Sequence, residues 1–418
     1  MIRDILVLQK RELERRKSEP FIERDVVQRL KDMMSNDLVK VITGPRRAGK
    51  SFLGMNLLFS VGNFGYVNFD DEKLIDVQNY DAIIAAINSI YTNPKFILFD
   101  EIQNLPKWEL FVNRLQRQGY NLVITGSNSK LLSSELSPHL TGRHISVTIF
   151  PFSFSEFLRL DKKELTSQEM KEKLFNYVKY GGYPEPLIKK IDHKEYLSTL
   201  FNSIIYKDIV KRFKIRLIPA VENLAFFLLS NTGEEFSYNT LSRITKCKSV
   251  HTVEKYLNYL EESFIFFRIH RISSLIHEQL SSNKKIYCTD SGFIQFVGKQ
   301  SGTDIEKLIE NAVAVKLKKD ELNGGPNVYY WKHPLKQEVD FVLKSGTEII
   351  RIIQVCYNLK DIKKLEQKER SLIKAGKELS CNNLLMITDD YEGEKEVEWF
   401  RIKKKIMYLP LWKYLTQE

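Results

Sequence analysis

Residues 44–51 read GPRRAGKS and match the pattern GxxxxGK[ST]. Glycines at such a loop let the backbone curl so that its N–H groups point at phosphate oxygens, and the helix that follows adds its positive end. In this arrangement Lys50 reaches the β- and γ-phosphates of ATP, and the Ser51 hydroxyl ligates Mg²⁺. The alternative is a chance match in a glycine turn, but a strand-like run precedes the loop and helical spacing follows it. The predicted nucleotide-binding residues of the loop are Gly44, Pro45, Arg46, Arg47, Ala48, Gly49, Lys50 and Ser51.

A second motif, FILFDE at residues 96–101, places two carboxylates directly after four apolar residues. The apolar run predicts a buried strand, so both acids lie at its carboxyl end. We expect Asp100 to hold Mg²⁺ together with Ser51, and Glu101 to polarise the attacking water as general base. Taken alone, the motif is equally typical of a strand that ends in a polar turn. The phosphate-binding loop upstream favours the catalytic interpretation.

Polar residues follow the next predicted strand, in the sequence Thr125-Gly126-Ser127-Asn128. Ser127 and Asn128 are candidates for contact with the γ-phosphate or the lytic water, and the alternative is an ordinary turn at a strand end. Arg143, in LTGR at residues 140–143, is a candidate arginine that neutralises charge in the transition state, in its own subunit or in a neighbouring one. A surface salt bridge is the alternative role for Arg143.

Elements that would position these residues follow a regular alternation in the first 150 residues. Short apolar runs at residues 38–43, 64–70, 95–101 and 122–127 predict buried strands, and an apolar stretch at residues 81–91 predicts a helix. Strands that alternate with helices indicate an α/β fold with a parallel sheet. Beyond residue 150 this alternation stops. A helical, aromatic-rich stretch leads to a predicted strand pair in FIFFRIHRI at residues 264–272, and the remaining sequence predicts a mixture of helices and strands.

The composition of the 418-residue chain excludes several classes of protein. Apolar residues make up 43% and charged residues 28%, which excludes wholesale disorder and fibrous proteins. The four cysteines form no CxxC pair, so we expect a reducing compartment and neither zinc nor disulfides. With no signal peptide and no apolar run of about 18 residues, we expect a cytoplasmic protein without membrane contact. The net charge of +11 suits a polyanionic partner, or serves solubility if it is spread evenly.

A series of motifs resembles that of a known family. GPRRAGKS, YVNFDDEKL, FDEIQNLPKWE, ITGSNSKLL, LTGRHISVTIFPFSFSEFL, GGYPEP and IIYKDIV follow one another as in archaeal and bacterial AAA-like P-loop ATPases that carry a C-terminal domain resembling PD-(D/E)xK nucleases. The resemblance covers nearly the whole chain. It implies a parallel-sheet P-loop ATPase core at residues 1–150, a helical lid at 151–219, a winged-helix-like module at 220–298 and a nuclease-like domain at 299–418.

The middle module also has helix-turn-helix order in its own sequence. A helix at residues 240–244 and a turn at 246–249 precede a second helix, in which Val253, Tyr256, Leu257 and Leu260 form one apolar stripe. The other face carries His251 and Lys255, with Lys246 and Lys248 before it, and a basic recognition helix of this kind enters a major groove of DNA. FIFFRIHRI would be the wing. The alternative is a winged helix that serves only packing or protein contact, because glutamates dilute the basic face.

The nuclease resemblance implies a metal site whose positions fall on Glu310, Asp340, Gln354 and Cys356. Such a site needs carboxylates on Mg²⁺ and a lysine that activates water. Gln354 is a weaker ligand than a carboxylate and Cys356 carries no fixed positive charge, so we expect nuclease activity to be impaired. A migrated base such as Lys344 or Lys316 is the alternative. Glu310 and Asp340 otherwise have a structural role or bind a DNA-associated metal weakly.

The same C-terminal part carries two groups of basic residues. One spans residues 360–370 and the other residues 401–405, and both are either DNA-binding or solvated helical faces. Together these observations predict an ATP-hydrolysing, Mg²⁺-dependent enzyme that acts on DNA through its C-terminal half. Such an enzyme can also assemble as a homo-oligomer. The alternative is a STAND-like switch, in which the nucleotide state controls a protein partner and DNA plays no part.

Overall fold

The computed structural model of the protein describes residues 2–75, 77–128, 142–161, 163–247, 249–273, 275–298, 304–334 and 337–417. The chain divides into two compact units: unit 1 comprises Met1–Phe152 with Glu262–Phe264, and unit 2 comprises Ser153–Glu261 with Ile265–Glu418. Each unit is described by itself below. Thr141 and Lys248, which belong to two of the motifs above, lie outside the described residues.

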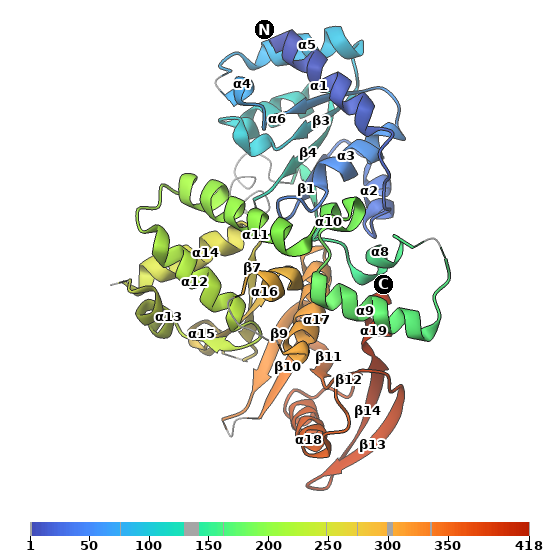
Figure 1. Ribbon diagram of the computed structural model, residues 1–418, viewed down its shortest axis with the longest axis vertical. Helices are drawn as coiled ribbons and strands as arrows, with labels where there is room; N and C mark the ends of the chain where they lie inside the picture. The colour runs from blue at the N-terminus through green and yellow to red at the C-terminus, as the bar shows by residue number, and fades with distance from the viewer. Residues whose placement is uncertain are drawn as a thin grey trace. The chain divides into compact units, whose positions relative to one another are not determined.

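Unit 1 is an α/β unit, drawn in blue to cyan in Figure 1. Its strands are β1 (Val39–Thr43), β2 (Phe64–Asn68), β3 (Phe96–Asp100), β4 (Asn121–Gly126) and β5 (His144–Thr148). Its helices are α1 (Ile2–Arg16), α2 (Val27–Met33), α3 (Lys50–Phe59), α4 (Glu72–Ile75), α5 (Tyr80–Tyr91), η1 (Ile102–Asn104) and α6 (Trp108–Arg117). The four strands and the helix predicted from the alternation are confirmed as β1 to β4 and α5. The fifth strand, β5, was not anticipated, because HISVT at residues 144–148 is short and partly polar.

The five strands form one parallel sheet in the order β2-β3-β4-β1-β5. The prediction of a parallel α/β core is therefore confirmed. Strands β1, β3 and β4 are almost entirely buried, which explains why their sequences are continuous apolar runs instead of alternating ones. Because β4 lies between β1 and β3, the segments that follow these three strands emerge at the same edge of the sheet.

The described residues of unit 2 form thirteen helical segments between residues 153 and 417. They are α8 (Phe154–Leu158), α9 (Ser167–Tyr180), α10 (Pro184–Lys189), α11 (His193–Ser203), the π-helix η3 (Ile204–Lys211), α12 (Ile218–Ser230), α13 (Tyr238–Thr245), α14 (Val250–Glu262), α15 (Ile276–Ser281), α16 (Ser291–Phe296), α17 (Ile305–Leu322), α18 (Ile362–Glu378) and α19 (Leu411–Thr416), of which α8 and α10 are single short turns. The apolar stripe predicted for the second helix of the middle module is confirmed, since Val253, Tyr256, Leu257 and Leu260 are the buried residues of α14. Within the described residues, no helix combines the length and the apolar character that crossing a bilayer demands.

The strands of unit 2 join in a single nine-stranded sheet. They are β6 (Glu235–Phe236), β7 (Phe266–Arg271), β8 (Lys284–Cys288), β9 (Asn327–Lys332), β10 (Glu338–Ser345), β11 (Glu348–Val355), β12 (Leu384–Thr388), β13 (Gly393–Trp399) and β14 (Ile402–Pro410). The order is β13-β14-β12-β11-β10-β9-β7-β8-β6, and β7 pairs in parallel with β9. The sheet thus runs across residues 298–299, where the sequence suggested a division.

Two predictions about strands and helices in unit 2 are wrong. FIFFRIHRI does not form a strand pair but the single strand β7, because it contains no turn residues that would reverse the chain. The basic residues 401–405 do not form a helical face, because they belong to the β13–β14 hairpin. Lysines at alternate positions of β14 face glutamates of β13, a pattern with the period of a strand.

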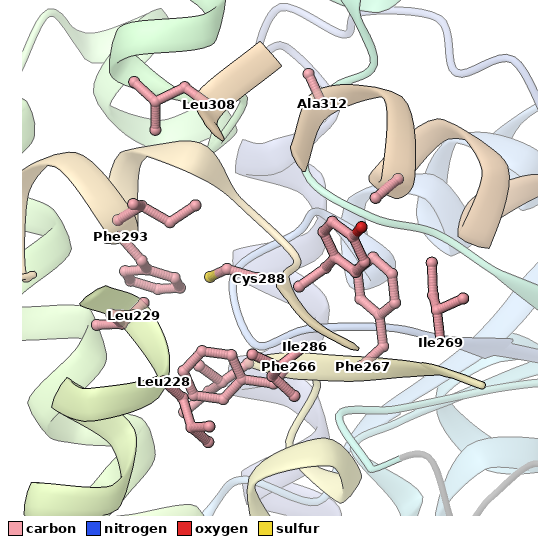
Figure 2. Packing of buried hydrophobic residues seen from close by; sticks show 14 of the residues in the cluster. Leu228, Leu229, Phe266, Phe267, Ile269, Ile286, Cys288, Phe293, Leu308 and Ala312 are labelled. Carbon is pink, nitrogen blue, oxygen red and sulfur yellow. The ribbon is translucent and has the colours of Figure 1, made fainter. Parts of the chain in front are cut away.

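The largest core of unit 2 lies where β7 and β8 meet the surrounding helices (Figure 2). Leu228 and Leu229 of α12, Phe293 of α16 and Leu308 of α17 pack around Phe266 and Cys288. All five residues of β8 are buried, including Lys284 and Lys285. Side chains alternate along a strand, so Lys285 and Tyr287 share the face of β8 opposite to Ile286.

A buried carboxylate, Asp290, closes the connection between β8 and α16. Its Oδ2 accepts a hydrogen bond from the amide of Gly182 at 2.7 Å, and its Oδ1 accepts one from the amide of Gly292 at 2.9 Å. Gly181, with φ +79°, cannot be replaced, because a Cβ there would lie 2.0 Å from Oδ1. Burial raises the pKa of Asp290 to about 7, although both amide hydrogen bonds favour the ionised form.

We expect Asp290 to make unit 2 less stable as the pH rises from about 4 to about 7. A folded-state pKa above the unfolded value means that the folded chain holds the proton over this window, so raising the pH removes up to roughly 4 kcal/mol of unfolding free energy. Asp290→Asn should flatten this dependence. Urea unfolding at pH 5, 6, 7 and 8 measures it, with Asp192→Asn as control, because Asp192 is an exposed cap of α11. Equal pH profiles for Asp290→Asn and the wild type would contradict the assignment.

Candidate functional site

The loop between β1 and α3 requires glycine at two positions. Gly44 has φ +143°, and a Cβ there would lie 1.9 Å from the carbonyl oxygen of Ile149. Gly49 has φ +96°, a conformation that L-residues with side chains rarely adopt. The Lys50 ammonium folds back over the loop and donates to the carbonyl oxygen of Pro45 at 2.9 Å. The backbone therefore curls tightly at the start of a ten-residue helix, the geometry of an anion-binding loop.

The order of the strands brings the acidic pair to this loop. Asp100 ends β3, and Glu101 follows it, at the edge of the sheet from which the loop leaves β1. Lys50 Nζ lies 3.7 Å from Glu101 Oε1, and the Ser51 hydroxyl is close enough to the Asp100 carboxyl to lower its pKa. Residues from the two motifs, separated by about a third of unit 1, thus converge on one small region.

Asp100 is almost fully buried among hydroxyl groups. Its Oδ1 accepts a short hydrogen bond from Thr125 Oγ1, and its Oδ2 accepts one from the Tyr66 hydroxyl at 3.4 Å. Burial and the neighbouring charge of Glu101 raise the pKa of Asp100 above its ordinary value. A buried carboxylate of this kind is short of positive charge, and a cation beside it would stabilise its ionised form.

Glu101 has a different environment from its neighbour. Burial raises the pKa of the Glu101 carboxyl, but the charge of Lys50 and hydrogen bonds from Gln103 and Ser127 outweigh burial, so the pKa lies below its ordinary value. Ser127 Oγ donates to Glu101 Oε2 at 3.0 Å, and Gln103 Nε2 donates to the same oxygen at 2.5 Å. Glu101 also has φ +51°, a left-handed conformation uncommon for glutamate. The adjacent carboxylates therefore differ in basicity.

Thr125 and Gln103 belong to this site although the sequence did not single out their roles. Thr125 donates to Asp100 and accepts a hydrogen bond from the Glu101 amide at 3.1 Å, so one hydroxyl touches both acidic residues. The strand-ending position of Thr125 on β4, next to β3, was the available signal. Ser127 contacts Glu101 directly, and Asn128 is buried beside it in the sequence.

Arg24, in the segment between α1 and α2, holds the loop from outside. Its guanidinium donates to the carbonyl oxygen of Ala48 at 2.8 Å and to that of Phe150 at 2.5 Å. Arg24 is 4% exposed and lies over the ring of Phe152. Nothing in the spacing of residues 20–30 marks this arginine, because its partners are main-chain atoms far away in the sequence.

Arg143 is not brought together with the loop. Its side chain is exposed and donates to Asn113 Oδ1 at 2.9 Å, while its carbonyl oxygen accepts from the Val39 amide at the start of β1. Gly44 follows the far end of the same strand, so roughly 13 Å of strand separates Arg143 from the start of the loop. Arg143 and the loop therefore lie at opposite edges of the sheet.

The C-terminal acidic residues converge within unit 2, but on a lysine that the sequence did not single out. Lys285 Nζ lies 2.6 Å from Glu338 Oε1, 3.4 Å from Glu310 Oε1 and 3.8 Å from Asp340 Oδ1. The Tyr287 hydroxyl donates to Glu310 at 2.7 Å. The three carboxylates outweigh burial and raise the pKa of the Lys285 ammonium well above its ordinary value. An internal ammonium thus neutralises the cluster.

The remaining nuclease-like positions complete this network. Gln354 Nε2 donates to Asp340 Oδ2 at 2.7 Å, and the amide of Val355 donates to the same oxygen at 2.8 Å. Cys356 is buried, and burial raises the pKa of its thiol. Lys316, a candidate migrated base, pairs with Asp320 on its own helix at 3.3 Å. No group of three or more histidine, cysteine or acidic side chains poised for a metal ion occurs among the described residues.

We expect Lys285→Met to destabilise unit 2 by about 3–5 kcal/mol, because it leaves one buried and two half-buried carboxylates without their counter-charge. Lys307→Met is the matched control: its ion pair with Glu234 is exposed to solvent and should cost about 1 kcal/mol or less. Thermal and urea unfolding measure both changes. Adding Glu310→Gln to Lys285→Met should restore part of the loss, and an unchanged or larger loss in the double variant would contradict the charge explanation.

Comparison with known proteins supports the assignment of unit 1 as an AAA-like unit. Residues 36–158 match the family described as "AAA domain", and residues 171–304 match a domain of unknown function, DUF8612. The chain resembles the walker-type ATPase PABY2304 of Pyrococcus abyssi, with a TM-score of 0.46 and 14% identity over 66% of this chain and 96% of that one. It also resembles a STAND protein with a tetratricopeptide repeat sensor, PH0952 of Pyrococcus horikoshii, with a TM-score of 0.29 and 16% identity over 72% and 46% of the chains. With TM-scores below 0.5, neither likeness bears on the function.

Two full-length relatives are much more similar in sequence. "Uncharacterized protein MJ1544" of Methanocaldococcus jannaschii is 32% identical over 403 residues, which cover 90% of this chain and 88% of the relative. An "Uncharacterized protein" of Haemophilus influenzae is also 32% identical, over 82% of this chain and 88% of the relative. The chain therefore belongs to the same family as these proteins, and it contains an AAA domain at residues 36–158.

Proposed function

We propose that this protein binds ATP with Mg²⁺ and hydrolyses it at the edge of the sheet where β1, β3 and β4 end. The observation that carries the proposal is the convergence of Lys50 and Ser51 with Asp100 and Glu101. The loop amides and Lys50 would hold the phosphates, as in other loops of this sequence pattern. Pro45, Arg46, Arg47 and Ala48 would contribute main-chain contacts.

The donor set beside the loop suits Mg²⁺. Ser51 and Asp100 offer a hydroxyl and a carboxylate that lie near each other, and Mg²⁺ prefers a few hard oxygen ligands with water in the remaining positions. The raised pKa of Asp100 expresses the same shortage of positive charge. When bound, the metal supplies charge stabilisation for the β- and γ-phosphate oxygens.

Glu101 is our proposed general base. Its carboxylate is kept ionised by Lys50 and is oriented by Gln103 and Ser127, so that it can accept a proton from water without reorganising. Thr125 contacts both acidic residues. Its hydrogen bonds, and those of Ser127, would change when the charge near Glu101 changes. Asn128 completes the proposed contacts near the γ-phosphate.

We expect Lys50→Ala to abolish nucleotide binding and Glu101→Gln to separate binding from turnover. The amide of the second variant keeps the shape but cannot accept a proton, so hydrolysis should fall by about 100-fold or more while ATP affinity changes little. Phosphate release measures turnover, and calorimetry with Mg·ATP measures binding. Asp81→Asn, an exposed carboxylate-to-amide change on α5, should have no effect. Equal turnover in all four proteins would show that the site is wrongly assigned.

Arg143 would act on the nucleotide of a neighbouring subunit, since it lies at the opposite edge of the sheet from its own loop. This proposal implies a homo-oligomer. Arg143→Ala should then lower turnover without changing ATP affinity, and wild-type turnover per subunit should rise with protein concentration. A turnover that is independent of concentration and of Arg143 would refute it.

We further propose that unit 2 combines a winged-helix-like and a nuclease-like part and acts with DNA. Support for the first comes from the order α12-β6-α13-α14-β7-β8, in which β8 pairs with both β6 and β7. Support for the second comes from the order α17-β9-β10-β11-α18-β12, with Glu310 and Asp340 facing one another across Lys285. Since an ammonium occupies the centre of that acidic cluster, we propose that this part does not cleave DNA.

A further inference from the structure

A short basic segment follows the π-helix of unit 2. Residues 207–216 read KDIVKRFKIR and contain five basic side chains and one acidic one. Helix η3 ends at Lys211, and the chain then turns through Lys214, whose φ is +51°. The amide of Ile215 bonds to the carbonyl oxygen of Val210 at 3.0 Å, so the turn is closed by a main-chain hydrogen bond. The basic side chains are therefore displayed on a defined backbone.

An aromatic stack joins this segment to α14. The rings of Phe213 and Tyr259 lie 3.6 Å apart between centroids, with an interplanar angle of 7°. The Arg212 guanidinium lies 5.7 Å from the centroid of Phe213, and Lys255 Nζ lies 5.9 Å from that of Tyr259. Two segments that are about 40 residues apart in the sequence thus contribute to one surface, termed the basic surface. Its residues are Lys207, Lys211, Arg212, Lys214, Arg216 and Lys255, and all six are exposed.

Four charges of the basic surface are not neutralised by an ion pair among the described residues. In the part of the chain that the structure describes, Lys207, Lys211, Lys214 and Arg216 make no ion pair and no side-chain hydrogen bond. Asp208 is the single acidic residue of the segment. Exposed cations of this kind retain their counterions in solution, and a bound phosphate chain would release them.

The other basic groups of unit 2 differ in this respect. Lys403 lies 3.6 Å from Glu398, and Lys405 lies 3.3 Å from Glu394, across the β13–β14 hairpin. On α18, Arg370 pairs with Glu366 at 2.8 Å, and Lys364 pairs with Glu306. Lys364, Arg370, Lys403 and Lys405 are therefore matched by nearby carboxylates. Of the three basic groups, the basic surface has the least internal compensation.

We propose that the basic surface binds the phosphate backbone of duplex DNA. This inference rests on the proposal that the protein acts with DNA, and it names the residues that make the contact. The cations flank α14, whose exposed His251 and Lys255 belong to the same helix-turn-helix segment. Phosphate contacts from the flanking segment would fix the position of α14 on the duplex, while carrying no base specificity themselves.

Fluorescence anisotropy with a labelled 30-base-pair duplex, in the absence of nucleotide and over a series of salt concentrations, tests the proposal. The variant Lys211→Ala/Lys214→Ala/Arg216→Ala removes three charges of the basic surface. We expect it to bind about tenfold more weakly or worse at 0.1 M salt, and to reduce the slope of log K against log salt by about 2–3. The single variant Lys214→Glu should weaken binding in the same direction.

The matched control is Arg370→Ala/Lys403→Ala/Lys405→Ala, which removes three exposed charges that are paired internally. It should bind like the wild type, and circular dichroism checks that all variants are folded. Equal weakening in both triple variants would overturn the proposal, because net charge alone would then explain binding. No binding of the wild type at 50 mM salt would also overturn it and favour the switch with a protein partner. If the wild type bound phosphatidylserine vesicles more tightly than the duplex, and the first triple variant weakened both kinds of binding equally, the partner would be a membrane surface instead of DNA.

The test is independent of hydrolysis. Lys50→Ala should bind the duplex as the wild type does, because the basic surface lies in unit 2 and no nucleotide is present. A protein that binds DNA through these residues but does not hydrolyse ATP would contradict the proposed activity and leave the basic surface standing. A protein that hydrolyses ATP but shows no effect of the triple variant would do the reverse.

Discussion

The contact between Lys50 and Glu101 depends on a strand that carries neither residue. Strand β4 separates β1 from β3, and its last residues provide Thr125 and Ser127, which hold the two carboxylates in place. If β1 and β3 were neighbours, these hydroxyls would have no position between the loop and the acids. The whole candidate site therefore depends on parallel pairing in the order β3-β4-β1, which the apolar interiors of the three strands stabilise.

Much of unit 1 could be predicted from the sequence, because its information is local. Buried parallel strands are continuous apolar runs, and the glycine-bearing loop must leave one of them, so β1, β3 and the positions of Lys50 and Asp100 follow from neighbouring residues. Gln103 and Arg24 could not be predicted in the same way. Their hydrogen bonds reach atoms that only the tertiary fold brings near, and their own sequence neighbours are unremarkable.

Unit 2 illustrates the same limit more strongly. The apolar stripe of α14 was predictable from helical spacing, whereas the role of Lys285 was not. KKIYC reads as a half-polar strand, and only the approach of α17 and β10 turns Lys285 into a buried counter-charge. Similarly, Lys403 and Lys405 are basic in the sequence but are paired with glutamates once the hairpin forms. Composition reports the amount of charge, and the fold decides how much of it remains available to a partner.

The parallel pairing of β7 with β9 joins the middle and C-terminal parts of unit 2 in one sheet. His270 aligns with Tyr329 and Arg271 with Tyr330, and the amide of Ile272 donates to Tyr330 at 2.8 Å. A chain that was cut near residue 298 would lack β9, so the edge of β7 would be unpaired. Unpaired strand edges promote self-association. Each part would leave this edge unpaired without the other, so we expect the two parts to fold only when they are joined in one chain.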